Sequence, residues 1–259
     1  MMSNLRKRYG RRLPQVSQRA LKNTAAVLML LVNGSRIIIE KGLLRLDTYT
    51  VGGLLDAMDA DSRTMQLVGV ASIIQVLQGL LPPVFALLLV EGFLHTDHYA
   101  KYLGRVAAAA LVSELAYDFA MHGKFLEFSE QNPMLALVVA LVMLRIMKAL
   151  DRVSSVERAV VQILLLLCAG FWVVVFRVES GVELILLAAI FYCFREHDIV
   201  KLVLGVLVSL TDTIGPLAFC GLMFYNGERR LKLPSYVYYA IYPLHLLVFG
   251  IVARCFLLQ

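Results

Sequence analysis

The chain has 259 residues, of which 59% are hydrophobic and only 17% are charged, with a formal net charge of +6. This balance lies far outside that of soluble globular domains and predicts an integral membrane protein. No stretch is long and polar enough for a separate soluble domain, so we expect a basic cytoplasmic arm over residues 1–20 and a single transmembrane domain over residues 21–259.

Apolar segments along the chain predict about nine helices. Several of them have about the 20 residues that an α-helix needs to cross a bilayer. The segments lie near 21–39, 67–94, 103–121, 134–150, 159–176, 181–194, 199–210, 213–225 and 236–258. We therefore expect an all-α fold, a polytopic helical bundle in the membrane in which two regions are short or broken.

One irregular region lies between residues 199 and 225, where Thr211 and Asp212 separate two apolar runs. Each run would rise only about 18–20 Å at 1.5 Å per residue. The region is therefore either one long span or two short helices that meet at a kink. We expect Asp212 to be a structural partner of a helix end rather than an acid.

The other irregular region is the segment 67–94, which two glutamines, a glycine and a Pro-Pro pair interrupt. Broken helices at membrane depth are tolerated where protein or water satisfies the freed backbone groups. We therefore expect a polar cavity beside this segment, lined by Gln75, Gln78 and Glu91.

Lysine and arginine placement predicts the orientation of the bundle, because cytoplasmic loops carry the excess of these residues. The first 22 residues contain seven of them, and a later cluster comprises Arg229, Arg230 and Lys232. With nine helices and a cytoplasmic N-terminus, eighteen of the 25 Lys and Arg residues fall on the inner side. No small-residue cleavage site follows the first apolar segment, so we expect it to remain as an uncleaved span.

Polar residues that could react gather at the predicted cytoplasmic face. Glu91 and His95 are four residues apart, so on a continuing helix the carboxylate would lie beside the imidazole and fix its tautomer. His98 completes a spacing that a metal could use, but a solvated helix end is the commoner reason for such a group. The four cysteines lie in apolar runs without C-x-x-C spacing, so we expect neither a metal site nor disulfides.

The last apolar segment begins with tyrosines, a proline and a histidine. Tyr238, Tyr242 and His245 are spaced four and three residues apart, which places two phenols and an imidazole on one helix face. Pro243 is tolerated near a helix start, so we expect His245 just inside the span at the membrane boundary. An ionisable residue at such a depth is a functional candidate by default.

Four stretches of the sequence resemble signatures of the TraX family in their order and spacing. They are "LPPVFALLLVEGFLHTDHYAKYLGRVAAAALVSELAYD" (81–118), "QNPM" (131–134), "YNGERR" (225–230) and "YAIYPLHLL" (239–247). The resemblance covers most of the chain, and its E-G-F-x-H-T and Y-P-x-H-L pieces are fairly specific. It implies a multi-pass protein of the bacterial inner membrane, associated with conjugal pilin N-acetylation and similar to membrane acyltransferases that use cytosolic acetyl-CoA.

Two family features are absent from the chain. The family typically carries an Asp-His pair late in the first span, where "LKNTAAVLMLLVNG" has Val32 and Asn33. Its Asp-Tyr-Gly signature is replaced by "ESG", which begins at Glu179. If the first-span histidine is the family's base, asparagine cannot replace it, because an amide does not accept a proton near neutral pH. Either His245 or His95 carries the chemistry here, or the chemistry has been lost.

The sequence thus favours a membrane protein that transfers an acetyl group from acetyl-CoA to an amine or hydroxyl of a membrane-delivered acceptor, a pilin-like peptide or surface polymer. On this hypothesis His245 or His95 is the general base and Glu91 orients His95. Substrate binding is assigned to Tyr242, Tyr238, Thr96 and Asn132, and the donor phosphates to Lys101 or Arg105.

Two other classes of function remain open. A catalytically inactive TraX-like subunit would have membrane lipid and a conjugation or export assembly as its partners, and the absent Asp-His pair favours this alternative. A small-solute transporter is suggested by the broken helices, but the two halves show no convincing repeat. No nucleic acid is expected as a partner in any of these cases.

Overall fold

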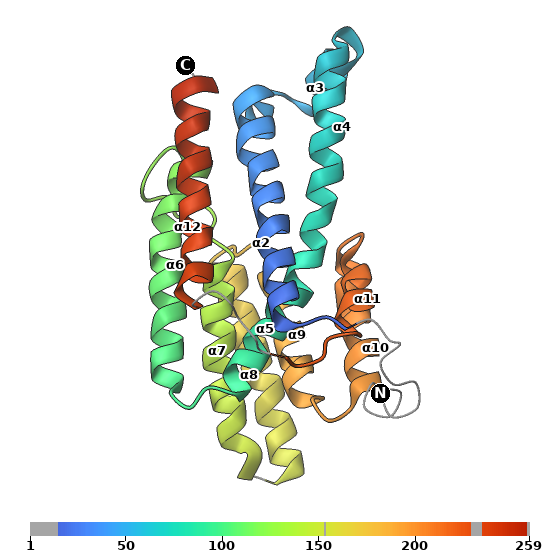
Figure 1. Ribbon diagram of the computed structural model, residues 1–259, viewed down its shortest axis with the longest axis vertical. Helices are drawn as coiled ribbons and strands as arrows, with labels where there is room; N and C mark the ends of the chain where they lie inside the picture. The colour runs from blue at the N-terminus through green and yellow to red at the C-terminus, as the bar shows by residue number, and fades with distance from the viewer. Residues whose placement is uncertain (1–14, 153, 229–234, 258–259) are drawn as a thin grey trace.

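The computed structural model describes residues 15–152, 154–228 and 235–257, and all regular elements within them are helices (Figure 1). The α-helices are α2 (Gln18–Gly34), α3 (Val51–Ala60), α4 (Ser62–Val76), α5 (Leu81–Leu94), α6 (Tyr99–His122), α7 (Met134–Ala149), α8 (Ser155–Val175), α9 (Gly181–Cys193), α10 (Asp198–Val208), α11 (Ala218–Leu222) and α12 (Ser235–Val252). The prediction of an all-α helical bundle is confirmed.

Shorter helical segments extend or join these helices. Two π-helical segments, η2 (Ser35–Leu43) and η8 (Ala253–Leu257), continue α2 and α12. The 3₁₀ segments are η3 (Leu46–Thr48), η4 (Leu77–Leu80), η5 (Leu150–Arg152), η6 (Ser209–Thr211) and η7 (Gly215–Leu217). Because α2 begins at Gln18, the end of the predicted basic arm is already helical.

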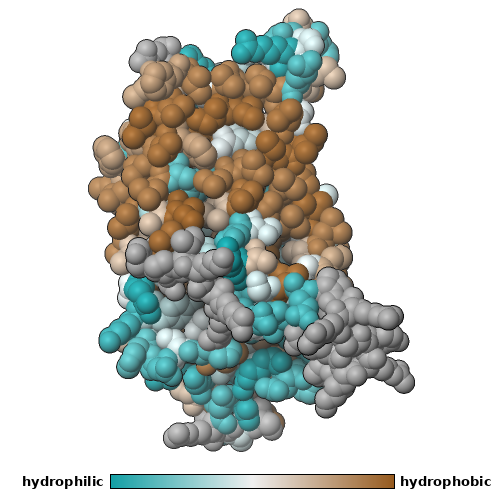
Figure 2. Space-filling model, in the orientation of Figure 1, coloured by the Kyte–Doolittle hydropathy of each residue, from teal (hydrophilic) through white to brown (hydrophobic). Residues whose placement is uncertain are grey.

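Three helical stretches among the described residues are long and apolar enough to cross a membrane: Ser62–Leu94, Val156–Val175 and Val237–Leu257. Only 11% of the apolar window in the second stretch is buried, which leaves side chains such as Leu164, Leu167 and Phe171 exposed. An apolar surface of this kind is stable against lipid rather than water. Figure 2 shows a broad apolar area over the upper half of the visible face, where exposed residues of α2, α4 and α12 lie.

Packing between neighbouring helices builds the interior. The helix α12 lies along α6, while α5 packs against α9, which also contacts α7. The fully buried core residues are mainly aliphatic, and they include Leu141, Leu144, Leu187 and Ala188. Since α2 packs against both α5 and α12, it closes one side of the space between these helices.

The break predicted within the segment 67–94 is confirmed, because the 3₁₀ segment η4 separates α4 from α5 at Gln78 and Gly79. The prediction that Gln75, Gln78 and Glu91 line one polar cavity beside this break is wrong. Gln75 donates a hydrogen bond to Glu40 at 2.7 Å, whereas Glu91 lines a different cavity one helix further along the chain. The amide of Gln75 therefore finds a protein partner on η2 instead of solvent.

Residues 199–225 form two short helices rather than one span. In Figure 1 α10 rises and α11 returns beside it, with η6 and η7 at the bend between them. Asp212 lies in this bend. The predicted basic cluster at 229–232 lies outside the described residues.

Residues 40–66, which lie between the first two predicted apolar segments, contain the helix α3 and the start of α4. Side-chain caps explain both helix starts. Thr50 accepts a hydrogen bond from the amide of Gly53 at the start of α3. Asp61 accepts hydrogen bonds from the amides of Arg63 and Thr64 at the start of α4. These bonds and the Thr64 hydroxyl hold the pKa of the Asp61 carboxyl below its usual value.

Candidate functional site

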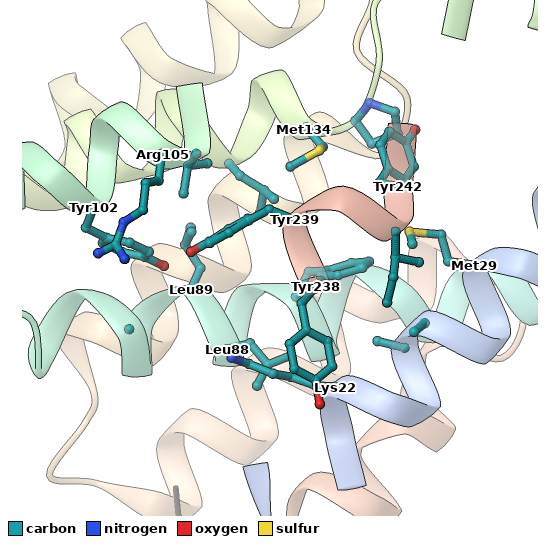
Figure 3. A pocket seen from close by; sticks show the side chains of 18 of the residues that line it. Lys22, Met29, Leu88, Leu89, Tyr102, Arg105, Met134, Tyr238, Tyr239 and Tyr242 are labelled. Carbon is teal, nitrogen blue, oxygen red and sulfur yellow. The ribbon is translucent and has the colours of Figure 1, made fainter. Parts of the chain in front are cut away.

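A cavity of about 430 Å³ lies between the starts of α2, α6 and α12 and the end of α5. Its walls are mostly apolar side chains, among them Ala25, Phe85, Leu88 and Leu137. Figure 3 shows Tyr102, Tyr239 and Arg105 at one end of this cavity and Met29, Met134 and Tyr242 at the other. The volume and the apolar lining are those of an ordinary small-molecule site.

Two cationic side chains line the cavity, Arg105 beside Tyr102 and Lys22 beside Tyr238 (Figure 3). The guanidinium of Arg105 is held from behind, because its Nε donates to the backbone carbonyl of Lys101 at 3.1 Å. The Lys22 ammonium lies 5.1 Å from the ring centroid of Tyr238. The Tyr238 hydroxyl in turn donates to Asn23 at 3.2 Å. These contacts fix two cations at the mouth, where an anionic ligand group would meet them.

His245 lies one helical turn beyond Tyr242, behind the apolar end of the cavity. Its imidazole is only 6% exposed and packs edge-on against the Tyr242 ring, with 5.4 Å between ring centroids. The expectation that Pro243 lies near the helix start is wrong, while the position of His245 at the membrane boundary stays a prediction. Because α12 begins at Ser235, Pro243 falls inside the helix and His245 reaches the interior of the bundle.

The hydrogen bonds of His245 define its tautomer. Its Nδ1 lies 2.7 Å from the carbonyl oxygen of Ile241, which only accepts, so Nδ1 carries the proton. The other ring nitrogen, Nε2, lies 2.9 Å from Nδ2 of Asn33 and accepts its amide hydrogen. His245 is thus neutral in this arrangement, and its basic lone pair points at Asn33.

An ionic cluster lies next to Asn33 along the same helix. Arg36 belongs to the π-helical segment η2, a geometry that is frequent at functional sites. Its guanidinium pairs with Glu179 at 2.5 Å and with Glu130 at 3.7 Å. Tyr117 donates to Glu130 at 3.4 Å. Arg36 lies three residues after Asn33, so the cluster is about one helical turn from the contact with His245.

Three residues of this arrangement were not predicted from the sequence. They are Asn33, which contacts His245, and the ion pair of Arg36 with Glu179. A signal for Arg36 was present, because an arginine within the apolar segment 21–39 needs a buried partner or water. The identity of that partner lies 143 residues away in the chain and had no local signal.

Of the residues predicted for the site, His95, Thr96, Arg105, Tyr238 and Tyr242 line the cavity. His95 is half-exposed at its edge. The Nδ1 of His95 donates to the backbone carbonyl of Glu91 at 2.9 Å, while the Glu91 carboxylate is 3.6 Å away. The backbone rather than the carboxylate thus makes the shorter contact with the imidazole.

Besides His245, three predicted residues lie away from the cavity lining. The Glu91 side chain lines a second cavity of about 200 Å³, together with Asp198 and Lys201. Lys101 is exposed and reaches the site through its carbonyl contact with Arg105.

Asn132 is 1% exposed, and its amide is fully engaged. The amide nitrogen donates to Glu114 and to the carbonyl of Ala110. Its oxygen accepts from the backbone amide of Met134 at 2.9 Å. Asn132 therefore holds the start of α7.

No cluster of three or more His, Cys, Asp or Glu side chains that could hold a metal ion occurs in the part of the chain that the structure describes. The described cysteines are free thiols.

Comparison with known proteins gives one match. The family described as TraX protein matches residues 57–253. No curated protein and no solved structure matches the chain. The matched residues contain the four stretches quoted above, whereas the first-span segment with Asn33 precedes them. Because the family match covers most of the sequence, the chain belongs to the TraX family.

Proposed function

We propose that this protein is a membrane-embedded acetyltransferase, which moves an acetyl group from acetyl-CoA to an amine or hydroxyl of a membrane-delivered acceptor. The observation that carries the proposal is the position of His245. A neutral, buried imidazole with its basic nitrogen unprotonated lies directly behind an apolar cavity that has a cationic mouth. General-base catalysis of acyl transfer uses such a neutral imidazole, and here its basic nitrogen becomes available once Asn33 releases it.

The cavity suits the acyl-bearing arm of a coenzyme A thioester. Its apolar walls accept the pantetheine chain, while Arg105 and Lys22 at the mouth offer positive charge to the phosphates. A volume of about 430 Å³ admits the arm and leaves the nucleotide outside. The thioester carbonyl would then reach Tyr242, which lines the inner end of the cavity.

In the reaction, Nε2 of His245 takes the proton from the acceptor's N–H or O–H group as that atom attacks the thioester carbonyl. A carbon–nitrogen or carbon–oxygen bond forms and the carbon–sulfur bond breaks. The proton on Nε2 then passes to the departing thiolate, which leaves as free coenzyme A and restores neutral His245. Asn33 must release Nε2 before the first step, because its amide hydrogen occupies the lone pair.

The ionic cluster of Arg36, Glu130 and Glu179 supports entry of the acceptor from the end of the bundle opposite the donor cavity. Its side chains are partly exposed, so the cluster is accessible from outside the core. Basic residues lie around the donor end, at the start of α6 and the end of α7, which favours that end as cytoplasmic. The proposed location is the bacterial inner membrane, with a cytoplasmic N-terminus.

One observation favours a second candidate, a catalytically inactive TraX-like subunit of a transfer or export assembly. Asn33 occupies the position where the family resemblance expects a histidine, and it blocks the basic nitrogen of His245. In that case the site would be a structural remnant held by hydrogen bonds.

Turnover by the purified protein separates the two candidates. The protein in nanodiscs is given radiolabelled acetyl-CoA and a membrane extract of its host, and labelled acceptor is counted. His245→Ala should lower the rate by about 10²–10⁴-fold, as expected for loss of a general base. His98→Ala is the matched control, because His98 is exposed at the start of α6. An inactive protein whose His245→Ala variant fully complements a deletion strain would establish the structural-subunit alternative instead.

A further inference from the structure

Three unwound segments meet beside the first turn of α9. The 3₁₀ segment η7 contacts both η4 and η6, so the break between α4 and α5 packs against the bend of the α10–α11 hairpin. Helix α10 also packs along α9. Unwound backbone presents carbonyl oxygens that lack helical donors, and in membrane proteins such segments coordinate monovalent cations.

Two carboxyl groups face each other at this junction. Glu183, in the first turn of α9, is 6% exposed, and its carboxyl group lies beside Asp212 and Ser209. Neither Glu183 nor Asp212 takes part in an ion pair with any residue in the described part of the chain. Two carboxyl groups at close range and without a basic partner are stable when a positive charge lies between them, and this is either a shared proton or a bound cation.

Two buried oxygens at the junction have no hydrogen-bond partner. These are Oε1 of Glu183 and Oγ of Ser209, a residue with 0% exposure. The two side chains are neighbours, yet they form no well-aligned hydrogen bond with each other. A buried oxygen without a hydrogen-bond donor costs free energy. Two such oxygens side by side therefore point to a ligand that lies between them.

Glycines bring the backbone close to these side chains. A Cβ at Gly79 would lie 2.8 Å from Cβ of Asp212, so glycine is needed for the approach. A Cβ at Gly215 would lie 2.6 Å from the carbonyl oxygen of Ser209 and 3.2 Å from that of Gly79. The carbonyls of Ser209 and Gly79 therefore both lie close to Gly215, and that of Ser209 accepts a hydrogen bond from the backbone amide of Asp212 at 3.2 Å.

We propose that Glu183, Asp212 and Ser209, with the neighbouring backbone carbonyls, form a binding site for a sodium ion. The donor atoms are all oxygens, which a hard cation prefers. Carbonyl oxygens of interrupted membrane helices coordinate sodium, which favours this ion, while calcium, which also binds carboxylates, is the alternative that the test below distinguishes. The ion would join α9, the α4–α5 break and the α10–α11 hairpin.

Bound sodium would also support the wall of the acetyl-donor cavity. Leu184, the residue after Glu183, lines that cavity. The site itself does not depend on the proposed acetyl transfer, because it is defined by separate residues on the other side of α9. Failure of either proposal would leave the other intact.

The test is the thermal stability of the full chain in detergent micelles, followed by the fluorescence of its one tryptophan. Sodium chloride should raise the midpoint of unfolding by roughly 2–4 °C over choline chloride at equal ionic strength, because a ligand that binds only the folded state stabilises it. Glu183→Gln and Asp212→Asn keep the side-chain size and should abolish the difference between the two salts. Ser209→Ala should reduce it.

Asp118→Asn is the matched control, because Asp118 on α6 is also buried with one unpartnered carboxyl oxygen. It should keep the response to sodium. Direct binding is measured by equilibrium dialysis of the unchanged protein with ²²Na⁺. This measurement tests the site even if a variant folds poorly. Equal stability in the two salts without ²²Na⁺ binding would mean that the carboxyl pair holds a proton, and would overturn the proposal. Stabilisation by calcium but not by sodium would overturn it too.

Discussion

The hydrogen bond between Asn33 and His245 provides the sharpest test of the proposed chemistry. At 2.9 Å the Asn33 amide occupies the only nitrogen of His245 that can accept a proton, since Nδ1 is already protonated and bonded to Ile241. If each catalytic cycle must break this bond, its strength is part of the activation barrier. Asn33→Ala removes the bond and leaves the imidazole in place.

The size of the effect follows from the bond. A hydrogen bond between neutral, partly buried groups contributes about 0.5–1.5 kcal/mol net. Because about 1.4 kcal/mol corresponds to a tenfold change in rate, the variant should transfer acetyl groups roughly 2–12 times faster. Stability should change in the opposite sense. The unpartnered Nε2 of the 6%-exposed His245 should cost about 1–3 kcal/mol in unfolding free energy.

The assay pairs initial rates of labelled acetyl transfer with thermal unfolding, for the unchanged protein, Asn33→Ala and Asn33→Asp. The aspartate variant keeps the shape of Asn33, but its carboxylate would hold His245 protonated and should suppress the rate. A rate for Asn33→Ala as low as that of His245→Ala would refute the reasoning. It would show that the amide is needed in the reaction rather than blocking it.

Arg105→Ala should raise KM for acetyl-CoA by roughly tenfold with little change in kcat, because the lost contact is to the donor phosphates. Steady-state kinetics measure both constants. Arg63→Ala, at the other end of the bundle, is the control and should change neither. The start of α4 should loosen in acid. The carboxyl of Asp61 has its pKa lowered in the folded state by Thr64, so its stabilisation is present above the unfolded value of about 3.9 and is lost as pH falls through the folded pKa. Hydrogen exchange of the α4 start, compared between pH 7 and pH 3, measures this loss. A cysteine replacing Glu228, in a protein freed of its native cysteines, should resist an impermeant thiol reagent in intact cells; labelling from outside would contradict the proposed orientation.

Local patterns allowed much of the fold to be predicted. Long apolar runs became helices, and the glutamine and glycine at 78–79 became the break between α4 and α5. The helix α3 was not predicted, because its ten residues are too few to cross a membrane and its start depends on one side-chain cap. The start of α12 at Ser235 lies one residue from the predicted segment, but the burial of His245 depends on the helices packed around it, which no local pattern gives.

The sequence by itself determined that the protein is an all-α bundle of the TraX family, and that a histidine lies close to tyrosines on the last helix. Hydrophobic periodicity gives which face of a helix is buried, and short spacings give neighbours on one helix. Neither pattern gives the rotation of one helix about its axis, or its shift along that axis, relative to a neighbouring helix. The contact between Asn33 and His245 joins residues 212 positions apart, and Glu183 meets Asp212 across a bend. Such contacts depend on how side chains of different helices interlock, and therefore only the tertiary structure decided them.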